Sequence, residues 1–441
     1  MSEKLISLGL DVGTTSTQRV LSELTIENQA GSFAVPQMEI QERKILYKSP
    51  VYFTPLIRGE LVDGDKIREI VDREYEKAGI SKNQVDTGAI IITGETSRKE
   101  NARSVLEALS RYAGDFVVAT AGPDLESVLA AKGAGAVDFS AKTGKRVLHM
   151  DIGGGTSNLA FIEDGKITAT TCLNVGGRLL KMDDTGEILY VSPVLEGLFH
   201  KKEGEMANRG EVEELAEKLV QALEMVGGLR ERTDLPEKLR TKEAESAWPE
   251  IPEGTVFSFS GGVADCVERD RRWLEFGDMG PELGQAIRRS RLCQGEYVLG
   301  AETIRATVIG AGSHSAQLSG STVFHQNVEF PLKNLPVAED AAVLAQLDGP
   351  GVLMVTGEAL DFAGVRDLAK ELTAVLKPPV YLAVSGDMAK ALGVQIALAL
   401  GPDAQVLCID RVNLRQGDYL DVGAPIGPAI PVVVKTLILG R

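Results

Sequence analysis

LHMDIGGGTSNLAFIEDGKITATT, residues 148–171, places Asp151 and three consecutive glycines directly after a short apolar run. The run 147–150 predicts a buried strand, because it is brief and the glycines interrupt it, so Asp151 lies at the strand's end. Two further β-prone runs, 159–162 and 167–170, are separated by Glu-Asp-Gly-Lys, which is typical of a hairpin. The glycines are therefore expected to form a tight turn between antiparallel strands.

A turn of this kind suits an anion. Gly153, Gly154 and Gly155 have no side chains, so their backbone N–H groups can approach a phosphate closely. Taken alone, a turn that is merely tight explains the glycines as well.

The N-terminal stretch LISLGLDVGTTSTQRVLSELTIE, residues 5–27, repeats this design. Asp11 follows an apolar strand, the glycine and threonines 13–15 follow Asp11, and another β-prone run comes next. Two copies of the pattern predict two related lobes that face one shared ligand. A carboxylate repels phosphate but suits Mg²⁺ or its water molecules, so the aspartates are candidate metal ligands.

The composition narrows the class of protein. A chain of 441 residues with 44% hydrophobic content can bury several cores, so two or three domains are expected. The net charge of −16 argues against nucleic acid or an anionic membrane as partner. No apolar run approaches the roughly 20 residues that span a bilayer, and the first strand begins too early for a signal peptide, so a cytoplasmic location is expected. The four cysteines lack CxxC spacing and are interpreted as buried thiols.

Strands and helices alternate between the two glycine turns. Helical periodicity or apolar runs predict helices over 65–78, 97–113 and 125–131 and strands over 89–92 and 116–119. This pattern predicts a mixed α/β sheet with the opening hairpin at its edge. The charged, proline-punctuated stretch 229–254 is expected to be a mobile surface loop.

Two later segments are rich in small residues. In TVFSFSGGVADCV, residues 255–267, a strand leads into Gly261, Gly262 and Val263, and a helix is expected from about Ala264. Such a turn lets a flat adenosine approach the backbone, although a strand-to-helix turn that needs small residues is the simpler alternative. In RATVIGAGSHSAQLSGS, residues 305–321, the segment 309–312 is expected to end an element that crosses between the lobes.

The C-terminal region contains its own strand and helix pattern. Three β-prone segments, VLMVTGEAL, PPVYLAVSG and QVLCIDRVN, alternate with helices expected over 363–376 and 387–400. We interpret residues 326–441 as an added α/β unit suited to binding a partner. Asp418 and Asp421 are interpreted as part of a solvated loop rather than as metal ligands.

Four motifs in this order, Asp11-Val-Gly-Thr-Thr, Asp151-Ile-Gly-Gly-Gly-Thr, Ser260-Gly-Gly-Val and Ile309-Gly-Ala-Gly, resemble the actin, heat-shock-chaperone and sugar-kinase ATPase superfamily. The resemblance implies an actin-like α/β fold with two ribonuclease-H-like lobes, 1–145 and 146–325, around a nucleotide cleft, followed by the unit 326–441. It implies ATP or ADP with Mg²⁺, with Asp11 and Asp151 as catalytic and metal-binding residues. The implied phosphate ligands are Gly13, Thr14, Thr15, Gly153, Gly154, Gly155 and Thr156, and the implied adenosine contacts are Gly261, Gly262 and Val263.

One position departs from this superfamily. Chaperone and bacterial actin-like members commonly carry a glutamate before the proline that opens the helix ahead of the second hairpin, but Gly122 precedes Pro123 here. Asp124 and Glu126 are the candidate substitutes. We expect strong nucleotide binding with weak ATPase turnover.

The chain also resembles, over nearly its full length, the EutA family of ethanolamine ammonia-lyase reactivating factors. The similarity includes VDTGAIIITGETSRKENA, HSAQLSGST, PVYLAVSGDMAKALG and CIDRVNLRQGDYLDVGAPI. It implies a molecular chaperone that uses ATP to release damaged cobalamin from its partner, adenosylcobalamin-dependent ethanolamine ammonia-lyase. A sugar-kinase-like phosphotransferase and an actin-like self-assembling ATPase remain open alternatives. A homo-oligomeric state and an association with a bacterial microcompartment also remain open.

Overall fold

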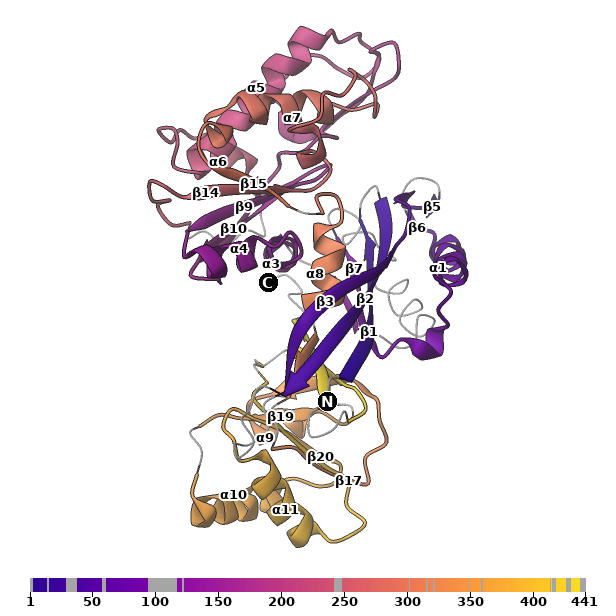
Figure 1. Cartoon of the computed structure of the whole chain (residues 1–441), viewed down its shortest axis with the longest axis vertical. Helices are drawn as coiled ribbons and strands as arrows, with labels where there is room; N and C mark the ends of the chain where they lie inside the picture. Colours follow the sequence, from indigo (N-terminus) through magenta and orange to yellow (C-terminus); the bar gives the residue numbers. More distant parts are fainter. Residues whose placement is uncertain are drawn as a thin grey trace.

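A computed structural model describes residues 3–13, 16–28, 38–57, 61–93, 117–120, 123–241, 248–300, 302–314, 316–319, 322–347, 349–357, 360–412, 414, 418–425 and 430–436. Three large sheets follow one another along the long axis of the molecule (Figure 1). The helix expected over 97–113 lies outside the described residues. Within the described part of the chain, no helix combines the length and apolar character needed to cross a membrane.

The first sheet has the strand order β3-β2-β1-β7-β8. Its strands are β1 (Glu3–Val12), β2 (Ser16–Asn28), β3 (Met38–Lys48), β7 (Thr87–Ile92) and β8 (Val117–Thr120). β2 pairs with β1 and β3 in antiparallel sense, whereas β7 is parallel to both β1 and β8. The expectation that the opening hairpin forms the edge is wrong, because the apolar β1 is central and the charge-rich β3 occupies the edge.

Shorter elements complete the first lobe. β4 (Tyr52–Phe53) pairs with the start of β2, and β5 (Leu56–Ile57) pairs with β6 (Leu61–Val62). The helix α1 (Gly64–Ala78) buries Ile67 and Val71 against the sheet, and Asp63 caps its first turn.

The second sheet repeats the arrangement of the first. Its order is β11 (Lys166–Leu173), β10 (Ser157–Glu163), β9 (Val147–Ile152), β14 (Val256–Ser260) and β15 (Tyr297–Leu299). β9, β10 and β11 are antiparallel, and β14 is parallel to β9 and β15. In both sheets the first strand, β1 or β9, is therefore central. On one side it begins an antiparallel run of three strands, and on the other side two strands run parallel to it. This is the ribonuclease-H-like topology, so the expected actin-like α/β fold is confirmed.

Helices cover the second sheet on the side away from the first lobe (Figure 1). They are α5 (Arg209–Val226), α6 (Leu235–Leu239) and α7 (Gly280–Arg289), and the strands β12 (Leu180–Met182) and β13 (Ile188–Val191) form a ribbon beside them. The stretch 229–254 was expected to be a mobile loop. Its described parts instead pack on the second lobe, because its apolar residues Leu239, Trp248 and Ile251 are buried in the hydrophobic core of that lobe. Trp248 Nε1 also donates a hydrogen bond to the Val226 carbonyl, at 3.0 Å.

Two helices cross between the lobes, α3 (Pro123–Gly133) and α8 (Ala306–His314), with α4 (Ala136–Thr143) next to α3. Their backbones nearly touch: a Cβ atom added to Gly133 would lie 1.8 Å from the Ala306 carbonyl oxygen, and one on Gly310 would lie 2.0 Å from that of Leu129. The predicted crossing segment is therefore a helix, and its glycines allow the close approach.

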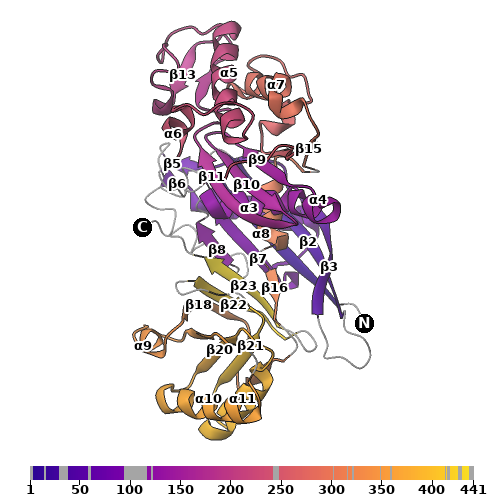
Figure 2. The same cartoon turned by 90° about the vertical axis from the view of Figure 1, so that its left-hand side faces the viewer.

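The third sheet belongs mainly to the C-terminal region (Figure 2). Its order is β16 (Ala316–Leu318), β23 (Pro431–Thr436), β22 (Asp418–Val422), β18 (Leu332–Ala338), β19 (Val352–Val355), β20 (Val380–Val384), β21 (Val406–Asp410) and β17 (Phe324–Gln326). α9 (Ala341–Leu344), α10 (Phe362–Val375) and α11 (Ala389–Leu400) pack on its parallel strands. The boundaries at 145 and 325 stay predictions. The solvated-loop interpretation of Asp418 and Asp421 is wrong, because both lie buried in β22.

Candidate functional site

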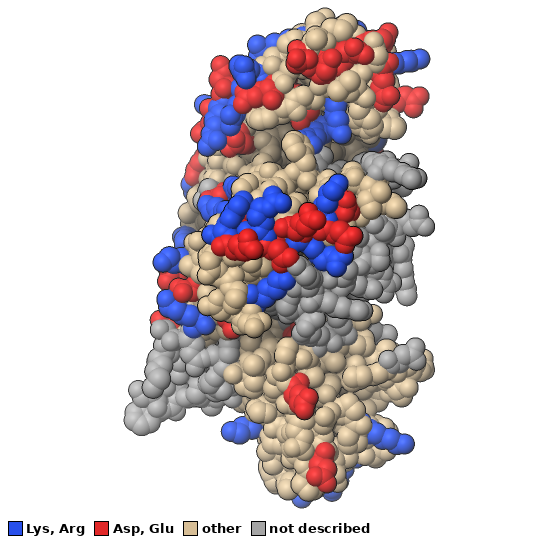
Figure 3. Space-filling view, turned by 90° about the vertical axis from the view of Figure 1, so that its right-hand side faces the viewer, with Lys and Arg blue, Asp and Glu red and all other residues tan. Residues whose placement is uncertain are grey.

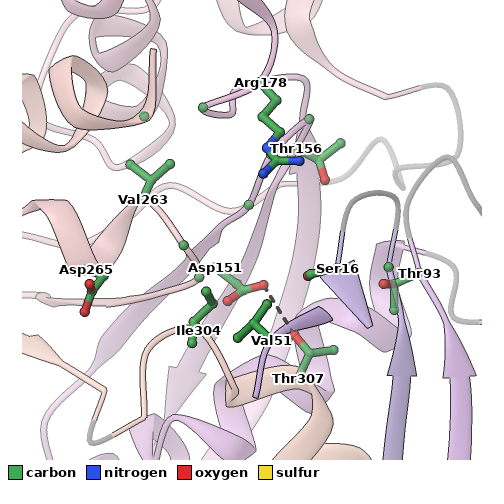
Figure 4. Close-up of a pocket in the computed structure, with 18 of the residues that line it drawn as sticks. Ser16, Val51, Thr93, Asp151, Thr156, Arg178, Val263, Asp265, Ile304 and Thr307 are labelled. Atoms are coloured by element: carbon green, nitrogen blue, oxygen red, sulfur yellow. Dashed lines mark hydrogen bonds between the residues drawn. The ribbon is translucent and has the colours of Figure 1, made fainter. Parts of the chain in front are cut away.

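A cavity of about 510 Å³ lies where the first two sheets face each other. It is lined by every predicted site residue that the structure describes: Asp11, Gly13, Asp151, Gly153, Gly154, Gly155, Thr156, Gly261, Gly262 and Val263 (Figure 4). Thr14 and Thr15 lie outside the described residues. Side chains from sequence positions more than 200 residues apart therefore meet at one place.

The two glycine turns are equivalent hairpins. The Gly13 N–H group donates to the Ser16 carbonyl at 2.8 Å, and the Gly153 N–H group donates to the Thr156 carbonyl at 2.9 Å. The register agrees as well, since Asp11 faces Gln18 and Asp151 faces Asn158 across the respective strand pairs. Each lobe thus closes its turn with the same backbone hydrogen bond, and an aspartate lies two residues before the donor glycine.

Asp11 is a buried carboxylate that accepts a hydrogen bond from a neighbouring hydroxyl. Thr93, which follows β7, donates from Oγ1 to Asp11 Oδ1 at 2.9 Å. Burial raises the pKa of Asp11 to about 7, and the nearby Asp151 charge adds to this rise, while the Thr93 hydrogen bond opposes it.

Asp151 is held by hydroxyls from two other elements. Ser260 at the end of β14 donates to Oδ1, and Thr307 in α8 lies 3.4 Å from Oδ2, as the dashed line in Figure 4 marks. Burial raises the pKa of Asp151 to about 6, and both hydroxyls oppose the rise. Neither aspartate pairs with a lysine or arginine in the part of the chain that the structure describes, so a cation in the cavity would stabilise both ionised carboxylates.

His149 is a functional candidate that the sequence analysis missed. It is fully buried, and its Nδ1 and Nε2 atoms each lie 3.0 Å from a serine oxygen, in Ser258 and Ser260 respectively. Burial lowers the pKa of His149 to about 3, so the ring is neutral near neutral pH. Because Ser260 gives its proton to Asp151, its oxygen accepts from Nε2–H, and Nδ1 accepts from Ser258. A chain of hydrogen bonds therefore reaches Asp151 from inside the sheet.

The glycine pair after β14 has two different roles. Gly261 has a φ of +88°, and a Cβ atom there would lie 2.3 Å from the Ile152 carbonyl oxygen, so this position requires glycine. Gly262 has open space where its Cβ would be and borders the cavity. The expectation of a helix from Ala264 is wrong. A short 3₁₀ turn, Ala264–Cys266, forms there, and the next α-helix, α7, begins at Gly280.

Glu126 and Asp124 are the two candidates to replace the glutamate that is absent before Pro123, and they differ in their position relative to the cavity. Glu126 lines the cavity. Asp124 Oδ1 instead accepts a hydrogen bond from Thr170 Oγ1 of β11, at 2.6 Å. Glu126 is therefore the better placed of the two.

Arg178 and Asp278 also line the cavity and were not among the predicted site residues. The Gly177 N–H group donates to the Gly153 carbonyl at 3.0 Å, and the Arg178 N–H group donates to that of Gly154 at 2.6 Å. The only sequence signal for this support was the glycine pair 176–177, which has no Cβ atoms to hold the loop away from the turn.

One family model and two curated proteins match almost the entire chain. A family model described as "Ethanolamine utilisation protein EutA" matches residues 3–348 and 345–440. The curated protein "Ethanolamine ammonia-lyase reactivase EutA" of Salmonella typhimurium is 36% identical over 467 residues, covering 99% of both chains. The Escherichia coli protein of the same name is 37% identical over 472 residues, again covering 99% of both.

Solved structures are more distant. A Ppx/GppA protein of Aquifex aeolicus gives a TM-score of 0.35 at 17% identity, covering 60% of this chain and 69% of that one. The ethanolamine utilization protein EutJ of Carboxydothermus hydrogenoformans gives 0.34 at 18% identity, covering 69% and 88%. These scores are too low to establish a shared fold, so the fold assignment rests on the order and sense of the strands. The sequence matches, in contrast, extend over nearly all residues, and the chain belongs to the EutA family of ethanolamine utilisation proteins.

Proposed function

We propose that this protein is an ATP-dependent reactivase that releases damaged cobalamin from adenosylcobalamin-dependent ethanolamine ammonia-lyase. Two relatives at 36% and 37% identity carry the name of a reactivase of this lyase. The observation that carries the nucleotide part is the pair of equivalent aspartate-glycine hairpins that border one cavity from two lobes.

The backbone of the two hairpins would bind the phosphates. Gly154 and Gly155 border the cavity without side chains in the way, so their N–H groups are the candidate phosphate donors. The N–H groups of Gly13 and Gly153 instead close the two turns, through hydrogen bonds to Ser16 and Thr156. The open backbone at Gly262 would receive the adenosine. Glu126, which lines the cavity, would orient an attacking water.

Asp11 and Asp151 would hold Mg²⁺. Carboxylate oxygens are the ligands that this ion prefers, and both side chains are buried at the cavity without a lysine or arginine partner among the described residues. When bound, the ion would offset phosphate charge and polarise the terminal phosphoryl group. Ser260, Thr93 and Thr307 keep the two carboxylates oriented.

Reactivation requires that the nucleotide state alters the partner. A nucleotide held from two sides favours a closed arrangement of the lobes, and loss of the terminal phosphate weakens that preference. To open a cofactor site, the protein must bind the opened lyase more tightly than the closed one, since equal affinity shifts nothing.

The test uses lyase blocked with hydroxocobalamin, mixed with free adenosylcobalamin, Mg²⁺ and this protein, with ATP present or omitted. We expect ATP-dependent recovery of ammonia release, together with cobalamin in the filtrate. The Asp151→Asn variant is the control and should recover little activity, because it loses a metal ligand while it keeps its size. Phosphorylation of a sugar or polyol without any recovery would favour the kinase alternative, and nucleotide-dependent filaments would favour the actin-like one.

A further inference from the structure

Arg178 lies directly against the second hairpin. Its backbone is bonded to the Gly154 carbonyl, and a Cβ atom added to Gly154 would touch the Arg178 side chain at 3.5 Å. Figure 4 shows the side chain extending from its loop into the cavity. The guanidinium group is therefore anchored at the turn that borders the proposed phosphate position.

The Arg178 side chain uses only part of its hydrogen-bonding capacity among the described residues. Its Nε atom lies 3.2 Å from Asp278 Oδ2, and its two terminal nitrogens make no hydrogen bond to any residue that the structure describes. Asp278 binds two groups, Arg178 and the backbone of Gly280, because its Oδ1 accepts a hydrogen bond from the Gly280 N–H group at 2.9 Å. A planar guanidinium with two free nitrogens matches two phosphate oxygens.

Arg271, the second arginine among the described residues that line the cavity, already uses its terminal nitrogens. Its terminal nitrogens already contact two carboxylates, Asp265 at 2.7 Å and Glu275 at 3.3 Å. The side-chain exposure of the two arginines is nearly the same, 27% for Arg178 and 25% for Arg271. Arg271 is thus a matched comparison whose charge is already balanced.

Across the cavity, Arg178 meets the first lobe at Phe53. The guanidinium carbon lies 5.8 Å from the centroid of the Phe53 ring, within the range of a cation–π contact. Phe53 is 79% exposed, and its strand β4 pairs it with Ser16, the residue that closes the first hairpin. One contact therefore joins the neighbourhoods of both hairpins.

We propose that Arg178 binds the terminal phosphate of the nucleotide and, through its contact with Phe53, couples the presence of that phosphate to the position of the first lobe. This inference rests on the proposed nucleotide function. The cavity also contains the acidic side chains Asp11, Asp151 and Glu126, so a triphosphate needs a cationic group at its distal end. When the terminal phosphate is lost, Asp278 and Phe53 remain as the partners of Arg178.

The first experiment measures the affinities of the intact chain for adenosine, ADP and the non-hydrolysable AMP-PNP by calorimetry with Mg²⁺. The Arg178→Gln variant should lose about tenfold or more in AMP-PNP affinity and less than about twofold for adenosine, because only the distal phosphate contact is removed. The AMP-PNP affinity of Arg178→Lys should lie between those of the wild type and Arg178→Gln, since lysine keeps the positive charge but not the planar pair of nitrogens. The matched Arg271→Gln variant should show no selective loss of AMP-PNP.

The second experiment measures the distance between the lobes by pulsed electron paramagnetic resonance. Spin labels at Glu69→Cys in α1 and Glu217→Cys in α5 are suitable, because both positions are exposed and the four native cysteines are buried. AMP-PNP should shift the distance in the otherwise wild-type protein, whereas Phe53→Leu should bind AMP-PNP and show a reduced shift.

Each result decides one proposal. Equal losses for adenosine and AMP-PNP in Arg178→Gln, or an undiminished shift in Phe53→Leu, would overturn this inference while the nucleotide function stands. If the wild-type protein binds no adenine nucleotide, the proposed function fails and this inference fails with it. A melting curve of each variant identifies unfolded protein, and Arg178→Lys serves as the test if Arg178→Gln does not fold.

Discussion

Two buried carboxylates at the cavity are the residues that most strongly set its chemistry. Asp11 is 9% exposed and Asp151 is 6% exposed, and each is oriented by a hydroxyl from a neighbouring element. Their pKa values, about 7 and about 6, mean that both carboxyl groups change protonation near neutral pH. A cation bound between them would favour the ionised form of both carboxyl groups.

The predicted consequence is an unusual pH dependence of the metal-free protein. The folded pKa values lie above the ordinary 3.8, so the folded state binds these protons more tightly than the unfolded state does. The stability from this source is complete below pH 3.8 and is lost as the pH rises through about 6 and about 7. The loss amounts to at most about 1.4 kcal/mol per pH unit for each carboxylate.

Denaturant unfolding in EDTA, at several values between about pH 5 and pH 8, measures this slope. Asp11→Asn and Asp151→Asn should each flatten the curve relative to the wild type, since an amide does not titrate in this range. Mg²⁺ affinity should change in the opposite direction and rise with pH. Parallel wild-type and variant curves would show that these two groups are not titrating as described.

At the scale of elements, the contact of α3 with α8 joins the two lobes. Gly133 of α3 and Gly310 of α8 each lie against the backbone of the opposite helix. Gly9 of β1 approaches α8 from its other side, where a Cβ atom on Gly9 would lie 2.3 Å from the Val308 carbonyl oxygen. α8 also carries Thr307, which contacts Asp151. The position of this helix therefore affects both the packing of the lobes and the site.

Gly310→Ala should destabilise the protein by at least about 2 kcal/mol, because the added methyl group meets backbone atoms that cannot move aside by rotamer change. A thermal unfolding scan should show a lower midpoint, and nucleotide affinity should fall as Thr307 shifts. Gly295→Ala is the matched control, since no atom lies within 4 Å of its Cβ position. An unchanged midpoint for Gly310→Ala would mean that the two helices do not pack this closely.

At the scale of the whole molecule, the C-terminal unit is the part that the proposed nucleotide site does not use. The two apolar clusters of its sheet contain only residues from 323 onward, so it has its own core. In Figure 3 the face of this unit, at the bottom, carries only scattered charges, whereas charges of both signs cover the lobes above. Phe362 and Leu398, on α10 and α11, are 69% and 73% exposed. These exposed apolar side chains are candidate contacts for the predicted protein partner.

Truncation after His314 should impair lyase reactivation more than nucleotide binding. A cut at 326 is less suitable, because β16 (Ala316–Leu318) pairs with β23 in the third sheet and would lose its neighbour. The measurements are AMP-PNP affinity and ammonia recovery, on a truncated protein that is shown to be folded and monodisperse. A truncated protein that reactivates the lyase as well as the full chain does would remove the C-terminal unit from the mechanism.

The sequence by itself determined the two hairpins, the strand-end aspartates and the α/β character of all three parts. Turn chemistry and strand periodicity act over a few neighbouring residues, so Asp151 and the turn after it could be read locally. It did not reveal that β1 is central, that Leu239 and Trp248 are buried, or that His149 connects to Asp151. Nor did it reveal that Arg178 reaches Phe53. These features depend on residues that lie from 22 positions apart, for Trp248 and Val226, to more than 100 apart, for His149 and Ser260. Sheet order and the packing of one lobe against the other bring them together. Only the tertiary structure decides such contacts, because neither partner carries a local signal for the other.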